Sequence, residues 1–442
     1  MLDGSSRLSR DWTTRRVPFV AAILLAVILR AIFILAVPVT PDSDGAWYLL
    51  RAQEMAAGMG YQERGHPTAF WPVGYPALLA GALMLTGPTL TGPLIANLMA
   101  SAAITTLIGA MARGLGATRQ AAVLSMLLYA VYPAHIVYTG VLAAETTSTA
   151  VLMAGVAALI LGRGRAGMAV VAGLLLGLAT LMRPQSMFVC MALIPTMWLS
   201  LRAFGWRRAL ATMLLAVAGM AVVVTPWTMR NQQQLGAPVL VSTNGGIALQ
   251  AGANDLATGG YFQVEKSPLW AQTGLSFDQR IERQVEMDAR LKRMAIDWIV
   301  QHPAEWAMLG VRKVVLLWAK DTDAFWSLHA SYPDRSGLWR VAQAGNQLVY
   351  LSILGLSAIG FAPSIAALWR RRLDQSAMTV ALAVPVLTTA LAFVFTGQTR
   401  YHYPAMPFLM IGAGLGLVWL VQRSRSRGIS STKLQGRWRL SS

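Results

Sequence analysis

The stretch from Pro38 to Pro76, PVTPDSDGAWYLLRAQEMAAGMGYQERGHPTAFWPVGYP, is a polar insert between two strongly apolar segments. The apolar run that precedes it, 17–37, is long enough to cross a lipid bilayer. Asp42 and Asp44 follow that run directly, so both acids are predicted to lie at a membrane surface, just outside the hydrocarbon. The insert is therefore predicted to be the first external loop of a membrane protein.

The composition is that of a polytopic membrane protein. Of the 442 residues, 55% are hydrophobic and only 13% are charged, and the mean hydropathy is +0.50, which is too apolar for a soluble domain of this size. The net charge of +18 resides in short arginine clusters between apolar runs, as the positive-inside rule predicts, so no nucleic-acid partner is expected. Cys190 is the only cysteine, which excludes an internal disulfide and a cysteine-based metal cluster.

The predicted fold is all-α, with about ten membrane spans. Hydropathy places them at 17–37, 90–112, 120–142, 145–162, 167–183, 185–201, 208–226, 343–363, 376–396 and 404–422. The first span follows several arginines, as a secretory signal does, but it is too long and lacks a small-x-small cleavage site, so it is predicted to stay uncleaved. The run 73–85 is too short to span and is predicted to be a re-entrant or surface helix. With this count every arginine cluster between spans falls on the cytoplasmic side, together with both termini.

Four regions follow from this topology. They are an N-terminal membrane module (1–229) with the external loop 38–76, an extracytoplasmic domain (230–342) between the seventh and eighth spans, C-terminal membrane helices (343–422) and a basic cytoplasmic tail (423–442). The second half of the external domain has the amphipathic pattern of helices that lie on a membrane. Only Asp3, Asp11 and Asp374 are predicted to be cytoplasmic, so carboxylate chemistry is expected outside.

Asp42 and Asp44 precede a predicted amphipathic helix that has Leu50 on its apolar side and Arg51 on its polar side. One acid would serve as a helix N-cap. The other could act as a general base toward an acceptor hydroxyl. The same choice arises at Glu145, an isolated acid at the outer end of two spans. It is either an exposed helix cap with Thr146 and Thr147 or a second acid that faces the same site as Asp44, and we favour the second interpretation.

Single cations stand at the predicted outer ends of other spans, namely Arg183, Arg230 and Arg400. Each one alone is explained by snorkelling to lipid headgroups. Together they favour a phosphate site, because the guanidinium fork binds phosphate oxygens. Lys313 and Lys320 are seven residues apart, share a predicted helical face and could join them.

Other candidate motifs point to ordinary structure. The five histidines show no zinc-binding spacing, although Asp42, Asp44 and Glu145 could supply oxygen ligands for Mg²⁺ or Mn²⁺ or work without an ion. The glycines of GLLLG (173–177) and GAGLG (412–416) lie inside predicted spans, where close helix packing is expected. Asp321 and Asp323 are interpreted as an acid pair in a loop.

Several motifs in a fixed order carry a family resemblance: PDSDGAWYLLRAQEMAAGMGY, WPVGYPALLAG, GLLLGLATLMRPQ, TPWTMRNQQQLGAPVLVSTNGG, DWIVQHPAEWAMLGVRKVVLLW and TRYHYPAMPF. The chain resembles the multi-spanning glycosyltransferases of the C-type fold that use polyprenyl-phosphate sugars. It looks most like glycosyltransferase family 39 and its bacterial relatives, which include protein O-mannosyltransferases and the transferase that adds aminoarabinose to lipid A.

The resemblance implies roles for particular residues. The family's catalytic base lies in a D-x-x-x-Tyr frame, which matches Asp44 to Tyr48, and its second acid best matches Glu145. Basic residues of the outer loops bind the donor phosphate, which implies Arg183, Arg230 and Arg400, with Lys313 and Lys320 as further candidates. Many relatives have a lysine where this chain has Trp71, so that ligand is absent or supplied by Arg64, His66 or another loop. The residues expected to contact substrate are Asp42, Tyr48, Tyr61, His66, Trp71, Tyr75, Tyr401 and His402.

The resemblance thus implies an inverting transfer of a sugar from a polyprenyl-phosphate carrier to a hydroxyl of an envelope glycan, lipid or protein. The reaction is expected at the extracytoplasmic face of a bacterial inner membrane. Two alternatives remain. One is a lipid or sugar flippase, although paired repeats, which are usual in transporters, are not evident in the sequence. The other is a noncatalytic subunit of an envelope glycan assembly complex, which would keep the fold without needing Asp44.

Overall fold

The computed structural model describes residues 4–201, 204–276 and 278–438. It is 79% helical, which confirms the predicted all-α membrane fold. Among the described residues, strands are limited to the short antiparallel hairpin of β1 (Gln62–Glu63) and β2 (His66–Pro67), with Gln62 opposite Pro67. This hairpin lies inside the first external loop.

The N-terminal half follows the predicted order of spans and loops. Its helices are α1 (Gly4–Ala36), α2 (Ser43–Ala56), α3 (Gly74–Thr86), α4 (Thr91–Gly114), α5 (Arg119–Val131), α6 (Pro133–Gly140), α7 (Ala144–Gly162), α8 (Ala166–Met182), η1 (Pro184–Phe188), α9 (Val189–Ser200) and α10 (Trp206–Leu235).

The C-terminal half begins with the short helices of the domain that was predicted to be external, and it ends with long apolar helices. They are α11 (Gly245–Ala251), η2 (Val264–Lys266), α12 (Pro268–Ala271), α13 (Gln279–Glu282), α14 (Gln284–Gln301), α15 (Pro303–Ala319), η3 (Asp323–Phe325), α16 (Trp326–Ser331), η4 (Pro333–Arg335), α17 (Ser336–Trp369), η5 (Ala377–Leu382), α18 (Ala383–Val394), η6 (Thr399–Ala405) and α19 (Met406–Trp438).

Each of the ten predicted spans coincides with a helical segment. In the described part of the chain, seven helices are long and apolar enough to cross a membrane, or eight if α5 and α6 count as one bent span. The remaining predicted spans are α8, with 17 residues, and the pair η1 and α9. The run 73–85 forms α3, which has only 13 residues, and its placement as a re-entrant or surface helix stays a prediction.

The predicted continuous span 120–142 is wrong in one respect, because α5 and α6 are bent by 53° at Tyr132. Pro133 lacks a backbone N–H and disfavours helical geometry at the residue before it, and Tyr132 has an extended ψ of 114°. The guanidinium of Arg30 donates to the freed carbonyls of Tyr129, at 3.0 Å, and Ala130, at 3.1 Å. Arg30 is fully buried and thus caps the broken end of α5.

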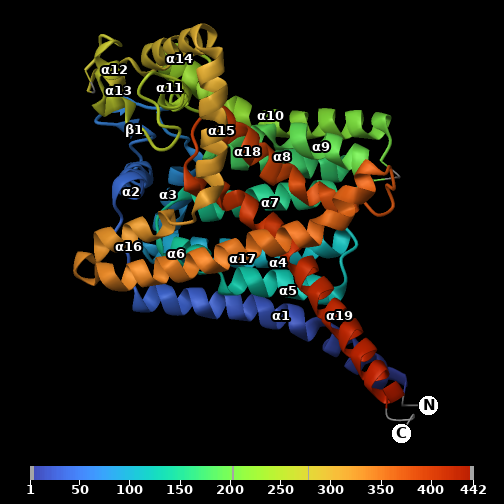
Figure 1. Cartoon of the computed structure of the whole chain (residues 1–442). Coiled ribbons are helices and arrows are strands. Elements are labelled where there is room, and N and C mark those ends of the chain that lie inside the picture. Colours follow the sequence, from blue (N-terminus) through green and yellow to red (C-terminus); the bar gives the residue numbers. More distant parts are fainter. Residues whose placement is uncertain (1–3, 202–203, 277, 439–442) are drawn as a thin grey trace.

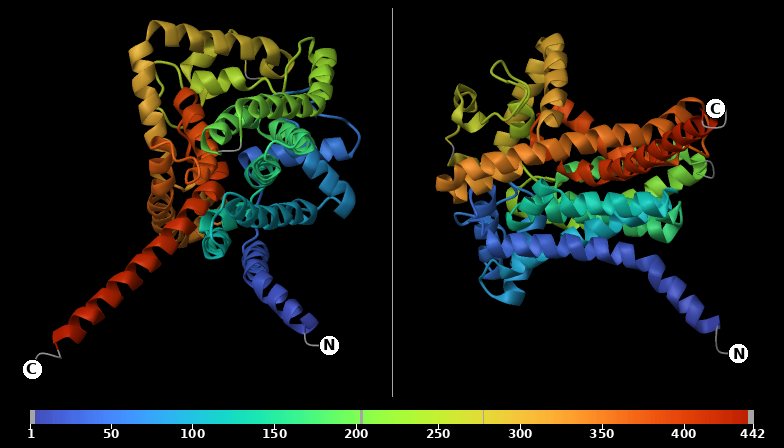
Figure 2. Two further views of the ribbon diagram at one scale, coloured as in Figure 1. Left: turned by 90° about the vertical axis from the view of Figure 1, so that its right-hand side faces the viewer. Right: turned by 60° about the horizontal axis from the view of Figure 1, so that its bottom comes forward.

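The helices form one bundle with two distinct ends (Figure 1). The start of α1 and the end of α19 lie at one end and extend away from the bundle (Figure 2), whereas α2, α3 and the external helices α11 to α14 lie at the other. Helix α15 crosses the bundle instead of running along it. Both termini therefore lie on the same side, as predicted, and the first loop lies opposite them.

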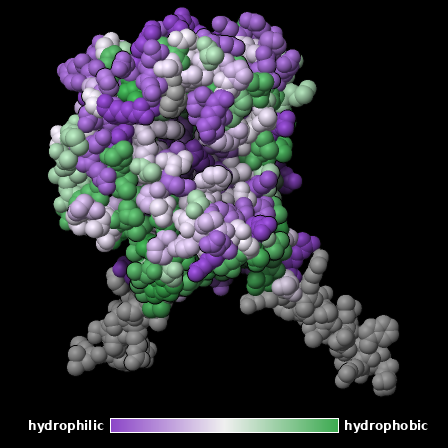
Figure 3. Space-filling model, turned by 90° about the vertical axis from the view of Figure 1, so that its left-hand side faces the viewer, coloured by the Kyte–Doolittle hydropathy of each residue, from purple (hydrophilic) through white to green (hydrophobic). Residues whose placement is uncertain are grey.

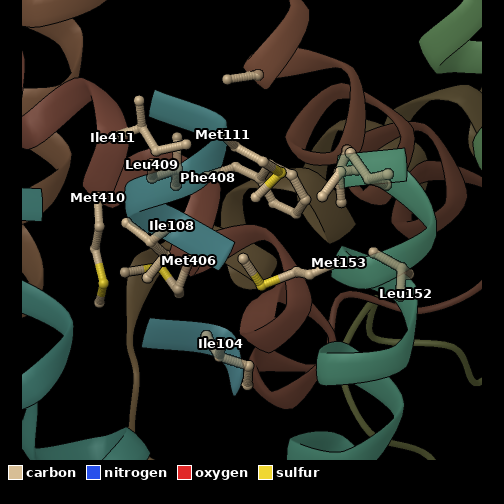
Figure 4. Packing of buried hydrophobic residues seen from close by; sticks show 14 of the residues in the cluster. Ile104, Ile108, Met111, Leu152, Met153, Met406, Phe408, Leu409, Met410 and Ile411 are labelled. Atoms are coloured by element: carbon tan, nitrogen blue, oxygen red, sulfur yellow. The ribbon is translucent and has the colours of Figure 1, made fainter. Parts of the chain in front are cut away.

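The bundle core is built where α4, α7 and α19 meet. Ile104, Ile108 and Met111 of α4 lie near Leu152 and Met153 of α7, and the run 406–411 of α19 closes the same cluster (Figure 4). By contrast, α1 keeps large apolar side chains exposed, as expected of a surface that faces lipid: Val17, Val20, Leu24, Ile28, Ile32 and Leu35.

The glycine motifs inside the spans are confirmed as close-packing sites. A Cβ placed on Gly173 would overlap the carbonyl oxygen of Ala216 in α10, and one on Gly416 would overlap that of Leu356 in α17. Backbones approach this closely only where one residue has no side chain.

This packing predicts opposite effects for two alanine substitutions in α8. Gly173→Ala should lower the free energy of unfolding by about 1–3 kcal/mol, because α10 must shift. Gly167→Ala should be neutral or stabilise by up to about 1 kcal/mol, since nothing lies within 4 Å of its added Cβ. Thermal unfolding in detergent measures both, and equal melting temperatures for the two variants would contradict the packing.

Candidate active site at one end of the bundle

Two close approaches fix the first external loop to the bundle. A Cβ on Gly45 would lie 2.7 Å from the carbonyl oxygen of Leu142, and a Cβ on Gly74 would lie 2.7 Å from that of Leu181. Glycine therefore lets the start of α2 touch the segment before α7 and the start of α3 touch the end of α8. As a result, Asp44 comes near Glu145, and the loop comes near Arg183.

The first ion pair of the site joins Asp44 to Arg400. Arg400 Nη1 donates to Asp44 Oδ2 at 2.9 Å, and its Nε donates to Gln398 Oε1 at 3.1 Å. Asp44 lies in the first turn of α2, where a carboxylate interacts favourably with the helix dipole. The side chains of Asp44 and Arg400 stay 34% and 28% exposed, so this pair remains accessible from outside.

The backbone beside Asp44 is strained. Ser43 has a φ of 46°, which is uncommon for a residue with a side chain. Such conformations cost free energy and are found most often at functional sites. The strain therefore adds to the interpretation of the Asp42 to Asp44 turn as functional.

The second ion pair joins Glu145 to Arg183 and is more deeply buried. Glu145 lies in the first turn of α7, Arg183 at the end of α8, and the guanidinium donates to Glu145 Oε1. The side chains of Arg183 and Glu145 are only 18% and 4% exposed, and each charge compensates the other. Glu145 is thus a buried, paired acid, and the alternative of an exposed cap with Thr146 and Thr147 is wrong.

Tyr48 lies between the two pairs. Burial raises its pKa above the ordinary value, Asp44 and Glu145 raise it further, and Arg183 and Arg400 oppose them. The phenol therefore stays protonated at physiological pH. Tyr75, which is fully buried, packs edge-on against the Tyr48 ring at 5.2 Å. The D-x-x-x-Tyr frame thus places Asp44 and Tyr48 on one face of α2, where both acids and both arginines act on the phenol.

These residues form a compact site of two acids, two arginines and one tyrosine. It lies at the bundle end that carries α2. Figure 3 shows that the upper part of this face is mainly hydrophilic, that its lower edge is hydrophobic, and that the face is hollowed near its centre, where hydrophilic residues are visible. An exposed carboxylate can accept a proton, and adjacent guanidiniums can hold an anion.

Asp42 occupies the N-cap position of α2, but its side chain makes no capping hydrogen bond. Instead, Ser327 Oγ donates to Asp42 Oδ1 at 3.3 Å. Asp42, Asp44 and Glu145 therefore have three different partners. Across the described residues, no group of three or more His, Cys, Asp or Glu could hold a metal ion, so these three carboxylates do not form a ready ligand set for Mg²⁺ or Mn²⁺.

Arg230 holds the first loop and does not share in either ion pair. It donates to the carbonyl oxygens of Tyr61, at 2.7 Å, and Thr68, at 2.8 Å, and lies over the ring of Trp227. Tyr61 OH donates to the carbonyl of Trp71 at 2.9 Å. These contacts separate Arg230 from Arg183 and Arg400, and its predicted contact with a donor phosphate stays a prediction.

The hairpin of the first loop is bound to the external domain. Arg280 donates to both oxygens of the buried Glu63, at 2.8 and 3.3 Å. His66 is exposed, with Nε2 3.6 Å from Glu282 Oε1. His66 thus belongs to the contact between loop and external domain, and its predicted contact with substrate is untested.

The two lysines do not share a helical face, contrary to prediction. Lys313 is fully buried and donates to the carbonyl of Val394, at 3.1 Å, where α18 ends. Lys320 lies one residue beyond the end of α15 and is exposed. Because the helix stops at Ala319, the seven-residue spacing no longer fixes their relative direction.

The prediction for α2 also needs correction at two positions. Arg51 is only 3% exposed, whereas Leu50 is 50% exposed. Arg51 donates to both oxygens of Glu54, at 2.6 and 3.0 Å, and lies over the ring of Trp47. The paired charge is covered by the aromatic ring, and the apolar Leu50 faces outward near the predicted membrane surface.

Sequence reasoning missed the part played by Asp321 and Asp323. Asp321 is 4% exposed; its Oδ2 accepts from Tyr132 OH, and its Oδ1 lies 3.5 Å from His402 Nε2. Burial raises the pKa of Asp321, but His402 and Tyr132 outweigh it and lower the pKa below its usual range. The interpretation as a loop acid pair is therefore wrong for Asp321. Its partners come from distant segments, and the only local signal is the D-x-D spacing.

Among the residues of the last external loop, Tyr401 lies under the Arg400 guanidinium, 5.6 Å from ring centroid to Cζ. His402 is 1% exposed, and its ring lies against those of Trp318 and Tyr350. These contacts show His402 holding the loop in place. The predicted contacts of both residues with substrate stay predictions.

The bundle and its site define a multi-pass helical membrane protein. No family model matches the sequence, and no curated protein is significantly similar to it. The structure is similar to that of the archaeal oligosaccharyltransferase AglB from Archaeoglobus fulgidus in complex with an inhibitory peptide and a dolichol-phosphate. The TM-score is 0.55 at 14% identity, over 94% of this chain and 52% of that one.

A second structure of the Archaeoglobus fulgidus oligosaccharyltransferase, in complex with Zn and sulfate, gives a TM-score of 0.55 at 14% identity, over 95% of this chain and 51% of that one. The chain thus spans about half the length of these proteins. ArnT from Cupriavidus metallidurans bound to undecaprenyl phosphate gives 0.44 at 14% identity, over 91% and 78% of the two chains, which is too low to establish a shared fold. The resemblance to glycosyltransferases of the C-type fold is confirmed at the level of the fold.

The buried ion pair predicts that removing one partner destabilises the protein more than removing both. Glu145→Ala should lower the free energy of unfolding by about 3 kcal/mol, because it leaves the Arg183 charge without its partner. The double variant with Arg183→Met should recover part of this loss. As a control, Asp278→Ala, which removes an exposed pair with Arg64, should cost less than about 1 kcal/mol. Strictly additive losses would show that the pair is not coupled.

The buried amine of Lys313 predicts a pH-dependent stability. Burial lowers its pKa to about 8, below the unfolded value of about 10.4. Between these values the unfolded state binds more protons, so the free energy of unfolding should rise with pH. Lys313→Met should flatten this rise in melting temperatures measured between about pH 7 and 10, whereas Lys320→Met should keep it. Identical profiles for all three proteins would refute the assignment.

Proposed function

We propose that this protein transfers a sugar from a polyprenyl-phosphate carrier to a hydroxyl group of an acceptor, with Asp44 as the general base. The observation that carries the proposal is the arrangement of Asp44, Arg400, Glu145 and Arg183 around Tyr48 at one end of the bundle. The shared fold with an oligosaccharyltransferase that is solved with a dolichol-phosphate supports a lipid-phosphate donor.

The proposed reaction is a single displacement. The acceptor oxygen forms a bond to the anomeric carbon, the bond from that carbon to the phosphate oxygen breaks, and the polyprenyl phosphate leaves with the electron pair. The proton of the acceptor hydroxyl passes to the Asp44 carboxylate. Attack from the face opposite the leaving group inverts the anomeric centre, as it does in inverting glycosidases.

Arg183 and Arg400 are the proposed ligands of the departing phosphate. Each guanidinium has five N–H donors and sits beside a carboxylate in the structure. A donor phosphate can bind N–H groups of Arg400 that do not donate to Asp44, so the guanidinium would contact the phosphate and the base together. Arg400 donates to Oδ2 of Asp44, and Oδ1 is the oxygen proposed to take the acceptor proton.

We propose that the site faces away from the cytoplasm. The arginines at the other bundle end, including Arg113 and Arg163 where α4 and α7 end, match the positive-inside rule. A bacterial inner membrane and an acceptor on an envelope glycan, lipid or protein fit this orientation. A dependence on Mg²⁺ or Mn²⁺ would require the second oxygens of Asp42, Asp44 and Glu145, which these hydrogen bonds do not use, to turn toward one ion.

The bend between α5 and α6 does not favour a transporter over an enzyme. Broken helices in transporters present free backbone groups to substrate or ions. Here the carbonyls freed at the bend accept hydrogen bonds from Arg30, which makes the bend a packed joint.

The base assignment predicts that Asp44→Asn slows transfer by about 10²–10⁴-fold while protein level and membrane insertion stay normal. Purified protein is incubated with a labelled polyprenyl-phosphate sugar and candidate acceptors, and released polyprenyl phosphate is measured.

Asp334→Asn, which changes an exposed acid near the start of α17, should keep full activity and serves as the control. Near-normal transfer by Asp44→Asn would refute the assignment of Asp44 as the general base. Movement of the labelled lipid across the membrane of vesicles that does not depend on Asp44 would favour a flippase. The absence of both sugar transfer and lipid movement would favour a noncatalytic subunit.

A further inference from the structure

We propose that Asp323 is a positioning residue that fixes Arg400 opposite Asp44, with Asp321 as the second point of the same clamp. This inference rests on the proposed function of the Asp44 site. Asp323 Oδ2 accepts a hydrogen bond from the backbone N–H of Arg400 at 2.6 Å. The contact is made to the main chain of the residue whose side chain binds the catalytic carboxylate.

The two acids match the last external loop residue by residue. Asp321 contacts His402, and Asp323 contacts Arg400. The two acids are two residues apart, as are their two partners, and the two chain segments run in opposite directions. Two fixed points set both the position and the direction of the intervening backbone. The D-x-D spacing therefore has a structural purpose that neither acid would achieve alone.

The segment that carries the acids is itself held firmly. Asn346 Nδ2 donates to the carbonyl of Asp321 at 2.6 Å, and the Asp321 N–H donates to Gln347 Oε1 at 3.1 Å. Both partners lie on α17. Tyr132, at the bend between α5 and α6, donates to the Asp321 carboxylate. The clamp is thus anchored to α17 and to the bend between α5 and α6.

The last loop is also held on its other side. The Gly397 N–H donates to the carbonyl of Gly259 at 2.8 Å, and His402 Nδ1 lies 2.7 Å from the carbonyl of Leu317. Asp323 binds the main chain of Arg400, whereas Gln398 accepts from its guanidinium. Hydrogen bonds to a charged acceptor are shorter and stronger than neutral ones, so loss of Asp323 should release Arg400 more than loss of a peripheral contact would.

The consequence for catalysis is geometric. A displacement of about 1 Å at a reacting group can cost about 10²-fold in rate. If Arg400 drifts from Asp44, the phosphate ligand and the base no longer face the same anomeric carbon. The loss should fall mainly on kcat, because Asp323 touches neither substrate in the proposed reaction.

The test compares Asp323→Ala with Asp323→Asn in the purified full-length protein. Asp323→Ala should lower kcat by about 10–100-fold with a smaller change in acceptor KM. Asp323→Asn keeps a side-chain oxygen that can accept from the Arg400 N–H and should stay within about threefold of the wild type. Thr322→Ala is the matched control, since Thr322 lies between the acids and its side chain makes no capping hydrogen bond.

A second readout does not depend on transfer. The rate at which phenylglyoxal modifies Arg400, followed by mass spectrometry, should rise at least about twofold in Asp323→Ala and not in Asp323→Asn or Thr322→Ala, because the released guanidinium leaves Asp44 more often. If the wild type transfers no sugar but the modification rates of the variants still differ in this way, the proposed function is refuted and the clamp is supported. Equal modification rates in Asp323→Ala and the wild type, both confirmed as folded by their melting temperatures, would overturn the clamp.

Discussion

The ion pair between Asp44 and Arg400 connects the first external loop to the last one, 356 residues later in the chain. Other contacts at this end of the bundle hold the two loops in the positions that this pair requires. Gly45 lets α2 approach the segment before α7, and Asp323 holds the main chain of Arg400. An ion pair between two loops forms readily only if other contacts already hold the loops in place, because ordering two flexible loops costs conformational entropy.

The buried charges around this site, as far as the structure describes the chain, have identified partners. Glu145 pairs with Arg183, Asp321 binds Tyr132 and His402, and Arg30 caps carbonyl oxygens at the bend between α5 and α6. Unpaired charges and polar groups are costly away from water. This requirement explains why arginines and acids from separate helices converge, and it makes the site more rigid than its position on loops would suggest.

Sequence reasoning was most accurate where the signal is local. Apolar runs predicted the helical segments, and proline and length marked α3 as short. The glycines inside spans indicated close packing. It failed for Asp321 because its partners, Tyr132 and His402, are far away in the sequence. It also failed for Arg51, whose partners are local, because hydropathy does not show that Glu54 and Trp47 cover the charge. Lys313 and Lys320 diverge because the helix ends between them.

The sequence by itself determined the membrane-spanning helical class, the common side of both termini and the candidacy of Asp44, since hydropathy, arginine distribution and a D-x-x-x-Tyr frame are all read along the chain. Only the tertiary structure decided that Arg183 and Arg400 share one site while Arg230 holds a loop, and that Asp323 supports Arg400. The reason is physical: which charges meet depends on helix packing and close backbone approach, and these join residues that are far apart in the sequence.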